Sequence, residues 1–189
     1  MSRIRSFIAI DTPAEVKERT SEVQEKLKTT DANVRWESKD KFHITVKFLG
    51  GVEASMLGTM ADRLRESLNE CTQMNITYRG VGCFPNPNHP RVIWIGAENK
   101  EGVLARLYGS IEEIAASFGV EREERQFHAH ITIGRVKGER NIMKLIAELD
   151  KVDFEPHTSI VKEILLMRSD LKPTGSVYTV LQRLPLKGN

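Results

Sequence analysis

The sequence predicts an α+β fold with mostly antiparallel strands, and three observations lead to this prediction. Strand-like and helix-like segments are intermixed without the regular single-helix crossovers of a doubly wound parallel sheet. The second half of the chain repeats the theme of the first half. No linker-like stretch separates the halves, so we expect residues 1–189 to form a single domain.

Hydrophobic periodicity assigns each element in order. Alternating apolar residues predict strands, and apolar residues three and four positions apart predict helices. Thr12, Pro13 and Glu15 form a capping-box start for the first helix, which runs to about Lys28. The first half then contains strands over residues 3–10, 34–36, 42–49, 76–84 and 91–95, and helices over residues 13–28 and 56–68.

The second half is assigned in the same way. Its helices are predicted over residues 104–118 and 142–149, and its strands over residues 127–133, 158–167 and 177–184. Two turns interrupt these patterns. The proline-rich segment 85–90 excludes regular structure, and residues 172–175 form a hairpin turn between the last two strands.

Composition indicates an ordinary globular protein rather than one that coats nucleic acid. Hydrophobic residues make up 40% of the chain and charged residues 29%, and the net charge is only +2. We therefore expect any RNA partner to be held through a few phosphates. No segment approaches the roughly 20 apolar residues of a membrane span, and the N-terminal apolar run is too short for a signal peptide. The sequence thus predicts a cytoplasmic protein without membrane contact, with Cys71 and Cys83 reduced and a monomer as the default state.

Two strands carry the same motif, which is the most informative feature of the sequence. One reads Phe-His-Ile-Thr-Val and the other reads Ala-His-Ile-Thr-Ile. Because side chains alternate across a strand, His43 and Thr45 project from one face, as do His130 and Thr132. Each pair presents an imidazole and a hydroxyl together, which suits a small anion such as a phosphate.

Two imidazoles on opposite sides of one phosphate can carry out an in-line displacement, because one takes a proton and the other gives one. Histidine suits both roles, since its usual pKa of about 6.5 lets both protonation states exist near neutrality. Neither a metal nor another cofactor is needed. A 2',3'-cyclic phosphate is a suitable substrate, because its ring is strained and only one ester bond must break.

Two other interpretations stay open. A single His-x-Thr on a strand is usually a solvent-exposed polar face, so the pair could be a structural duplication whose polar faces remained polar. His128 and His130 share a strand face and could chelate zinc, although a catalytic zinc site usually needs a third histidine, cysteine or carboxylate. The nearest acidic residues, Glu123 and Glu124, lie in a charged run typical of a solvated turn.

With these motifs the sequence resembles the 2H phosphoesterase superfamily, and most closely its RNA 2',3'-cyclic phosphodiesterase branch, also called 2'-5' RNA ligase. The resemblance covers nearly the whole chain. Besides the two motifs it rests on residues 5–10, Trp36, Phe48-Leu49-Gly50, Phe84-Pro85, Ser169-Asp170-Leu171, Gly175 and Tyr178.

The resemblance implies one domain with two pseudo-symmetric lobes, in which two mostly antiparallel sheets surround a central cleft and the helices lie outside. It also implies metal-independent hydrolysis of a terminal 2',3'-cyclic phosphate to a 2'-phosphate, with the 3' oxygen as leaving group. His43 is then the general acid and His130 the general base for water, and these roles exchange when the reaction runs as ligation. Thr45 and Thr132 bond the phosphate oxygens, and Arg135 contacts the phosphate or its transition state.

Strand parity bears on several residues beside the motifs. Arg135 falls on the face opposite the second motif unless Gly134 permits a bulge. Lys47 shares the polar face of the first motif, so it is either a contact to the RNA backbone or a plain exposed lysine. Phe7 and Phe42 share parity with apolar neighbours, which favours core packing over base stacking.

The expected partners are RNA ends that bear a 2',3'-cyclic phosphate, with tRNA halves as one candidate. Two alternatives to hydrolysis remain. The first is a 2'-5' RNA ligase that joins RNA halves with cyclic phosphate and 5'-hydroxyl ends, which depends on substrate positioning that no motif reports. The second is a non-catalytic RNA-end-binding module, although binding alone would not require both imidazoles.

Overall fold

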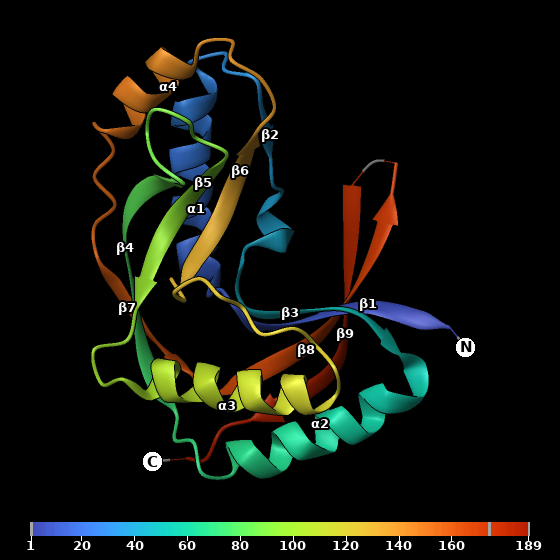
Figure 1. The fold of residues 1–189 in the computed structure, drawn as a ribbon. Coiled ribbons are helices and arrows are strands. Elements are labelled where there is room, and N and C mark those ends of the chain that lie inside the picture. Colours follow the sequence, from blue (N-terminus) through green and yellow to red (C-terminus); the bar gives the residue numbers. More distant parts are fainter. Residues whose placement is uncertain (1, 174, 189) are drawn as a thin grey trace.

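The computed structural model describes residues 2–173 and 175–188, and it confirms the predicted α+β class (Figure 1). Helices and strands alternate irregularly along the chain. In order, the elements are β1 (Arg3–Asp11), α1 (Ala14–Lys28), β2 (Val34–Trp36), the short 3-10 helix η1 (Lys39–Lys41), β3 (His43–Glu53), α2 (Ala54–Leu68), β4 (Met74–Phe84), β5 (Val92–Glu98), α3 (Val103–Ser117), β6 (His130–Val136), α4 (Ile142–Leu149), β7 (His157–Val161), β8 (Glu163–Lys172) and β9 (Gly175–Pro185).

The strands of the described residues form one curled sheet in the order β7-β4-β5-β6-β3-β1-β8-β9, with β2 paired to β6. Neighbouring strands in this sheet are antiparallel, as predicted. β5 lies along one edge of β6, and β3 and β2 share its other edge. The two sheets expected from the resemblance are therefore joined into one, through the pairing of Ile44 in β3 with Ile131 in β6.

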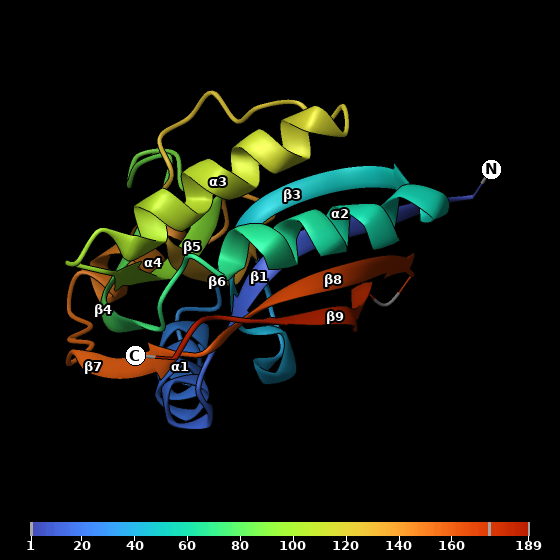
Figure 2. The same ribbon diagram turned by 90° about the horizontal axis from the view of Figure 1, so that it is seen from below.

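The helices lie outside the sheet. α2 contacts β3 and β9, and α3 contacts β3 and α2. Figure 2 shows α2 and α3 running side by side along one face of β3. α1 packs against α4 beside the part of the sheet that contains β6 (Figure 1). None of the helices in the described residues is long and apolar enough to cross a membrane.

β3 carries an extra residue directly after its motif. In the pairing of β1 with β3, Ile8 faces Lys47 and Ala9 faces Thr45, so Val46 has no opposite residue. Such a β-bulge reverses the alternation of side chains beyond it. The strand therefore follows the predicted alternation only as far as its motif.

The bulge at Val46 makes the prediction for Lys47 wrong. Lys47 is 6% exposed, its Nζ lies 2.7 Å from Glu112 Oε1, and it also donates to the carbonyl of Glu121 at 2.7 Å. Uninterrupted alternation from the motif would turn Phe48 toward the core, but after the bulge its side chain is 63% exposed. Lys47 thus ties α3 and the segment after it to β3, with its charge inside the protein rather than on the surface.

β6 carries the same irregularity at the same place in its motif. In the pairing of β5 with β6, Ile93 faces Gly134 and Trp94 faces Thr132, so Ile133 is the extra residue. The bulge on which the prediction for Arg135 depended is therefore present. Beyond the bulge, Gly134 faces Val34 and Trp36. A Cβ on this glycine would lie 2.8 Å from the Val34 side chain and 2.9 Å from the Trp36 ring.

Other boundaries differ from the predicted ones for local reasons. α1 begins at Ala14 with Pro13 at the cap position, one residue later than predicted, and no side chain caps it. The predicted strand over residues 158–167 is two strands, because β7 pairs with β4 whereas β8 pairs with β1 and β9. The predicted turn at residues 172–175 joins β8 and β9, and its Thr174 lies outside the described residues.

Candidate active site

The joint between β3 and β6 brings the two motifs onto one face of the sheet. Their central isoleucines are directly paired and fully buried. In an antiparallel pair, the residues on either side of such a pair project to the opposite face. Continuing the register by one residue in each direction aligns His43 with Thr132 and Thr45 with His130. We call the face that carries these four side chains the motif face.

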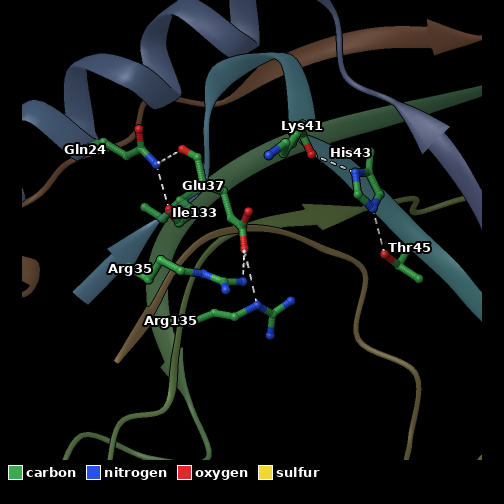
Figure 3. A network of polar contacts seen from close by, with 8 residues as sticks. All are labelled: Gln24, Arg35, Glu37, Lys41, His43, Thr45, Ile133 and Arg135. Carbon is green, nitrogen blue, oxygen red and sulfur yellow. Dashed lines mark hydrogen bonds and ion pairs between the residues drawn. The ribbon is translucent and has the colours of Figure 1, made fainter. Parts of the chain in front are cut away.

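The His43 ring is held at both nitrogens (Figure 3). Its Nδ1 lies 2.7 Å from the carbonyl oxygen of Lys41, and its Nε2 lies 3.0 Å from Thr45 Oγ1. A carbonyl oxygen can only accept, so Nδ1 carries a hydrogen and donates it. Nε2 is therefore the nitrogen that gains or loses a proton, and the Thr45 hydroxyl can respond to either state.

The His130 ring is fixed by the same kind of contact. Its Nδ1 lies 2.7 Å from the carbonyl oxygen of His128, so this nitrogen also carries a hydrogen and donates it. In both motifs the accepting carbonyl lies two residues before the histidine. Both imidazoles thus have the same tautomer in their neutral form, and each leaves Nε2 to exchange a proton.

Burial lowers the pKa of both histidines below the usual 6.5, and neighbouring charges then act in opposite directions. Burial has the largest effect on the pKa of His43. The bond to the Lys41 carbonyl and the carboxylates of Asp11 and Glu37 raise that pKa, and Lys17, the weakest of these causes, lowers it. Burial also has the largest effect on His130, but there the charges of Arg135 and His128 lower the pKa further. The charged surroundings therefore favour protonation at His43 and oppose it at His130.

Arg135 points toward a carboxylate that the sequence did not single out. Its Nε donates to Glu37 Oε1 at 3.3 Å, and Arg35 Nη2 lies 3.8 Å from the same oxygen (Figure 3). The backbone here is held by Gln24, whose Nε2 donates to the carbonyls of Glu37 at 2.8 Å and Ile133 at 2.6 Å. The bulged segment of β6 and the segment after β2 are thereby fixed to α1.

Aromatic rings pack beside each histidine. The Phe7 ring centroid lies 5.0 Å from that of His43, and Tyr178 meets His43 edge-on at 5.4 Å. Phe84 meets His130 edge-on at 5.1 Å. Phe7 is buried, as predicted, but it packs under the His43 ring. These ring contacts limit the rotation of both imidazoles.

A pocket of ≈ 440 Å³ opens beside His130. Its wall combines aromatic rings with the polar side chains of Arg79, Glu98 and Asn99. Trp94 forms part of this wall, and its indole Nε1 is buried without a hydrogen-bond partner among the described residues. The aromatic and imidazole residues that line the pocket are Phe84, Trp94, Phe127, His128 and His130.

The zinc interpretation of His128 and His130 depends on a third ligand nearby. Within residues 2–173 and 175–188, no three His, Cys, Asp or Glu side chains gather in a way that could hold a metal ion. Glu123 instead uses its backbone N–H to donate to Glu112 Oε2 at 3.3 Å, in the segment after α3. Glu123 and Glu124 line a pocket beside residues 47–53 of β3, whereas His128 and His130 line a different one.

Sequence reasoning found the motif residues but missed part of their surroundings. Glu37 and Arg35 follow no motif, and they join Arg135 only because β2 pairs with β6. Phe84 and Tyr178 contribute to the resemblance, yet no pattern indicated that their rings contact the histidines. These neighbours come from strands distant in the sequence, so only the fold could identify them.

Comparison with known proteins connects this site to a family. The family model described as LigT like Phosphoesterase matches residues 10–94 and 95–178, and each matched segment contains one motif. A relative from Methanothermobacter thermautotrophicus, named RNA 2',3'-cyclic phosphodiesterase, is 36% identical over 183 residues. That alignment covers 95% of this chain and 97% of the relative.

Two solved structures share the fold over almost their whole length. A crystal structure of a Thermus thermophilus protein matches with a TM-score of 0.81 and 26% identity, over 97% of this chain and 98% of that chain. E. coli LigT, crystallised in complex with 3'-AMP, matches with a TM-score of 0.78 and 27% identity, over 98% of this chain and 99% of LigT.

Proposed function

Because the chain belongs to the LigT-like phosphoesterase family, we propose that it hydrolyses 2',3'-cyclic phosphates at RNA ends to 2'-phosphates, using two histidines and no metal ion. The pairing of the two motifs across β3 and β6 carries the proposal, since it sets two matched imidazoles on one face of the sheet. The name of the Methanothermobacter relative and the 3'-AMP complex of LigT support RNA ends and nucleotides as the substrate class.

The reaction needs one proton to be taken and one to be given. His130 Nε2 takes a proton from water as the water oxygen attacks the phosphorus. The bond between phosphorus and the 3' oxygen then breaks, and protonated His43 gives its Nε2 proton to that oxygen. The products are a 2'-phosphate and a 3'-hydroxyl, and each histidine ends in the protonation state that the other began with.

The assignment of acid and base rests on the charges around each ring. The carboxylates of Asp11 and Glu37 raise the pKa of His43, which suits the group that must begin protonated. Arg135 and His128 lower the pKa of His130, which suits the group that must begin neutral. Burial lowers both pKa values, so the neighbouring charges distinguish the two roles.

The remaining motif residues fit the charge of the phosphate. Thr45 and Thr132 offer hydroxyls that can donate to the non-bridging oxygens. Arg135 has Nε on Glu37, and the end of its guanidinium is free of that contact and can approach the phosphate. The pocket beside His130 can hold the terminal base, because Phe84 and Trp94 supply rings on which a base can stack.

The direct test is to incubate EDTA-treated protein with a short RNA that ends in a 2',3'-cyclic phosphate and to identify the product. We expect a 2'-phosphate, and we expect His43→Ala and His130→Ala to lose the activity while they retain the fold by circular dichroism. A reaction that occurs only after zinc is restored would exclude the metal-independent mechanism. No turnover, with equal affinity for cyclic and linear ends, would indicate a binding module.

The cellular setting is part of the same proposal. We place the enzyme in the cytoplasm as a monomer of one domain with two pseudo-symmetric lobes, acting on RNA ends such as those of tRNA halves. The match of the family model to two successive segments supports the two lobes. Sedimentation of the purified protein tests the monomer.

A further inference from the structure

Arg35 occupies a place on the motif face that the proposed mechanism does not use. In the antiparallel pairing of β2 with β6, Arg35 lies directly opposite Arg135. Directly opposed residues in a sheet project from the same face. The two arginines therefore extend side by side, and both are open to solvent, with side chains 53% and 40% exposed.

The charges of Arg35, Arg135 and Glu37 add up to a net positive charge. Arg35 and Arg135 share a single oxygen of Glu37, whose side chain is only 15% exposed. Arg135 donates to it at 3.3 Å, whereas Arg35 lies 3.8 Å away, beyond hydrogen-bond distance. Two adjacent guanidinium groups thus share one carboxylate. The net positive charge suits an anion in addition to the one that Arg135 approaches.

Arg35 lies farther from His130 than Arg135 does, because Arg135 is on the same strand as His130 and Arg35 is on the neighbouring strand β2. In Figure 3, Arg135 lies between Arg35 and Thr45. The electrostatics agree, because Arg135 lowers the pKa of His130 while Arg35 is not among the causes of that shift. Both arginines also lower the pKa of Tyr178, Arg135 more strongly. Arg35 therefore lies beyond Arg135 as seen from His130.

An RNA end carries two neighbouring phosphates, one for each of the two arginines. Its cyclic phosphate is at the 3' end, and the next phosphate is the diester on the 5' side of the same nucleotide. A cyclic mononucleotide with a 5'-hydroxyl lacks this second phosphate. Resting on the proposed function, we propose that Arg35 binds the phosphate on the 5' side of the terminal nucleotide, and so makes the enzyme prefer RNA ends to cyclic mononucleotides.

The test compares two substrates that differ only in this phosphate. They are a nucleoside 2',3'-cyclic phosphate with a 5'-hydroxyl and the same compound with a 5'-phosphate, and a dinucleotide with a cyclic end serves as a third. For wild type we expect kcat/KM to be higher with the 5'-phosphate. In Arg35→Gln this preference should fall about tenfold through KM, because one charge-assisted phosphate contact is lost. Arg35→Lys should restore part of it.

The matched control is Arg65→Gln. Arg65 lies on α2, outside the sheet, and pairs with Asp62 at 2.7 Å, so this variant also removes one exposed arginine that has a carboxylate partner. It should keep the wild-type preference. The salt dependence of dinucleotide binding should also weaken in Arg35→Gln, by a slope of about 0.7 for one lost contact to a single strand.

Three results would overturn the inference. Arg35→Gln could keep the wild-type preference, it could lose activity equally on both mononucleotides, or Arg65→Gln could lose the preference as well. Failure of the proposed function is distinguishable, because wild type would then turn over none of the substrates. Arg35 can still be tested in that case by the affinities of nucleoside 2'-phosphates with and without a 5'-phosphate. If the wild type binds the two compounds with unequal affinity and Arg35→Gln binds them equally, the proposed role of Arg35 is supported. If the substitution changes neither affinity, that role is refuted.

Discussion

The strands β3 and β6 carry the same motif and the same bulge, but their surroundings differ. In both strands a backbone carbonyl two residues before the histidine fixes the tautomer, and an extra residue follows the threonine. His43 has carboxylates nearby, whereas His130 has Arg135 and His128. The motif thus sets the geometry of each imidazole, while the neighbouring charges favour one protonation state or the other.

The two bulges also put different residues at matching places. The second residue after each threonine turns toward the protein, and it is Lys47 in β3 and Gly134 in β6. The third residue turns to solvent, and it is Phe48 in β3 and Arg135 in β6. Only β6 therefore brings a positive charge to the motif face at this position, which makes the site electrically asymmetric.

The largest effect is expected from removing either imidazole. His43→Ala and His130→Ala should each lower kcat on an RNA cyclic phosphate by about 10²- to 10⁴-fold, the usual contribution of a general acid or base. Single-turnover rates measure this loss, and thermal melting checks that the fold is intact. If either variant turned over at the wild-type rate, the two-histidine mechanism would be wrong.

Lys47 should matter for stability rather than for substrate. Lys47→Met leaves the buried carboxylate of Glu112 without its partner, which should lower the free energy of unfolding by about 3–5 kcal/mol. The double variant with Glu112→Leu should recover most of that loss, and urea denaturation measures both. If Lys47→Met bound RNA more weakly while its free energy of unfolding stayed unchanged, Lys47 would instead be a contact to the RNA backbone.

Arg135 and Phe48 test the asymmetry between the bulges. Arg135→Gln removes a charge that approaches the phosphate, and it should lower kcat/KM about 10²-fold, as the loss of one preorganised donor does. Phe48→Ala, at the matching place in β3, should change kcat/KM far less. Equal losses in the two variants would mean that β3 and β6 contribute alike.

The smallest effect is a shift of pH dependence. With His43 active when protonated and His130 when neutral, kcat/KM falls on the alkaline side as His43 loses its proton. Because burial lowers the pKa of His43, this fall should lie below pH 6.5 in wild type. Glu37→Gln removes a charge that raises this pKa, so the fall should move to lower pH. A shift to higher pH would contradict the roles assigned here.

The sequence was sufficient for the fold class and for the face of the strand on which each motif lies. Strong alternation predicted β3 and β6 near their motifs, and the buried isoleucines between His and Thr fixed which face each motif presents. Local patterns work here because both faces of each strand are distinct in polarity. The same patterns left open whether the two motif strands were neighbours.

The sequence was not sufficient beyond the motifs. A bulge shifts the alternation by one residue and leaves no reliable mark in composition, so Lys47 was placed on the wrong face. The contacts of Glu37, Phe84 and Tyr178 depend on long-range pairing of strands. Charges and rings that act across strands are therefore the part of the site that required the structure.

In the proposed mechanism one histidine acts as the acid and the other as the base, and substrates with different leaving groups separate these two roles. An RNA cyclic phosphate releases an alkoxide that must be protonated, whereas a 4-nitrophenyl phosphodiester releases a phenolate that leaves without a proton. Relative to wild type, His43→Ala should be far less impaired on the aryl diester, and His130→Ala should be impaired on both substrates. The assignment would be contradicted if His43→Ala were equally impaired on both substrates. It would also be contradicted if only His130→Ala were less impaired on the aryl diester than on the RNA cyclic phosphate.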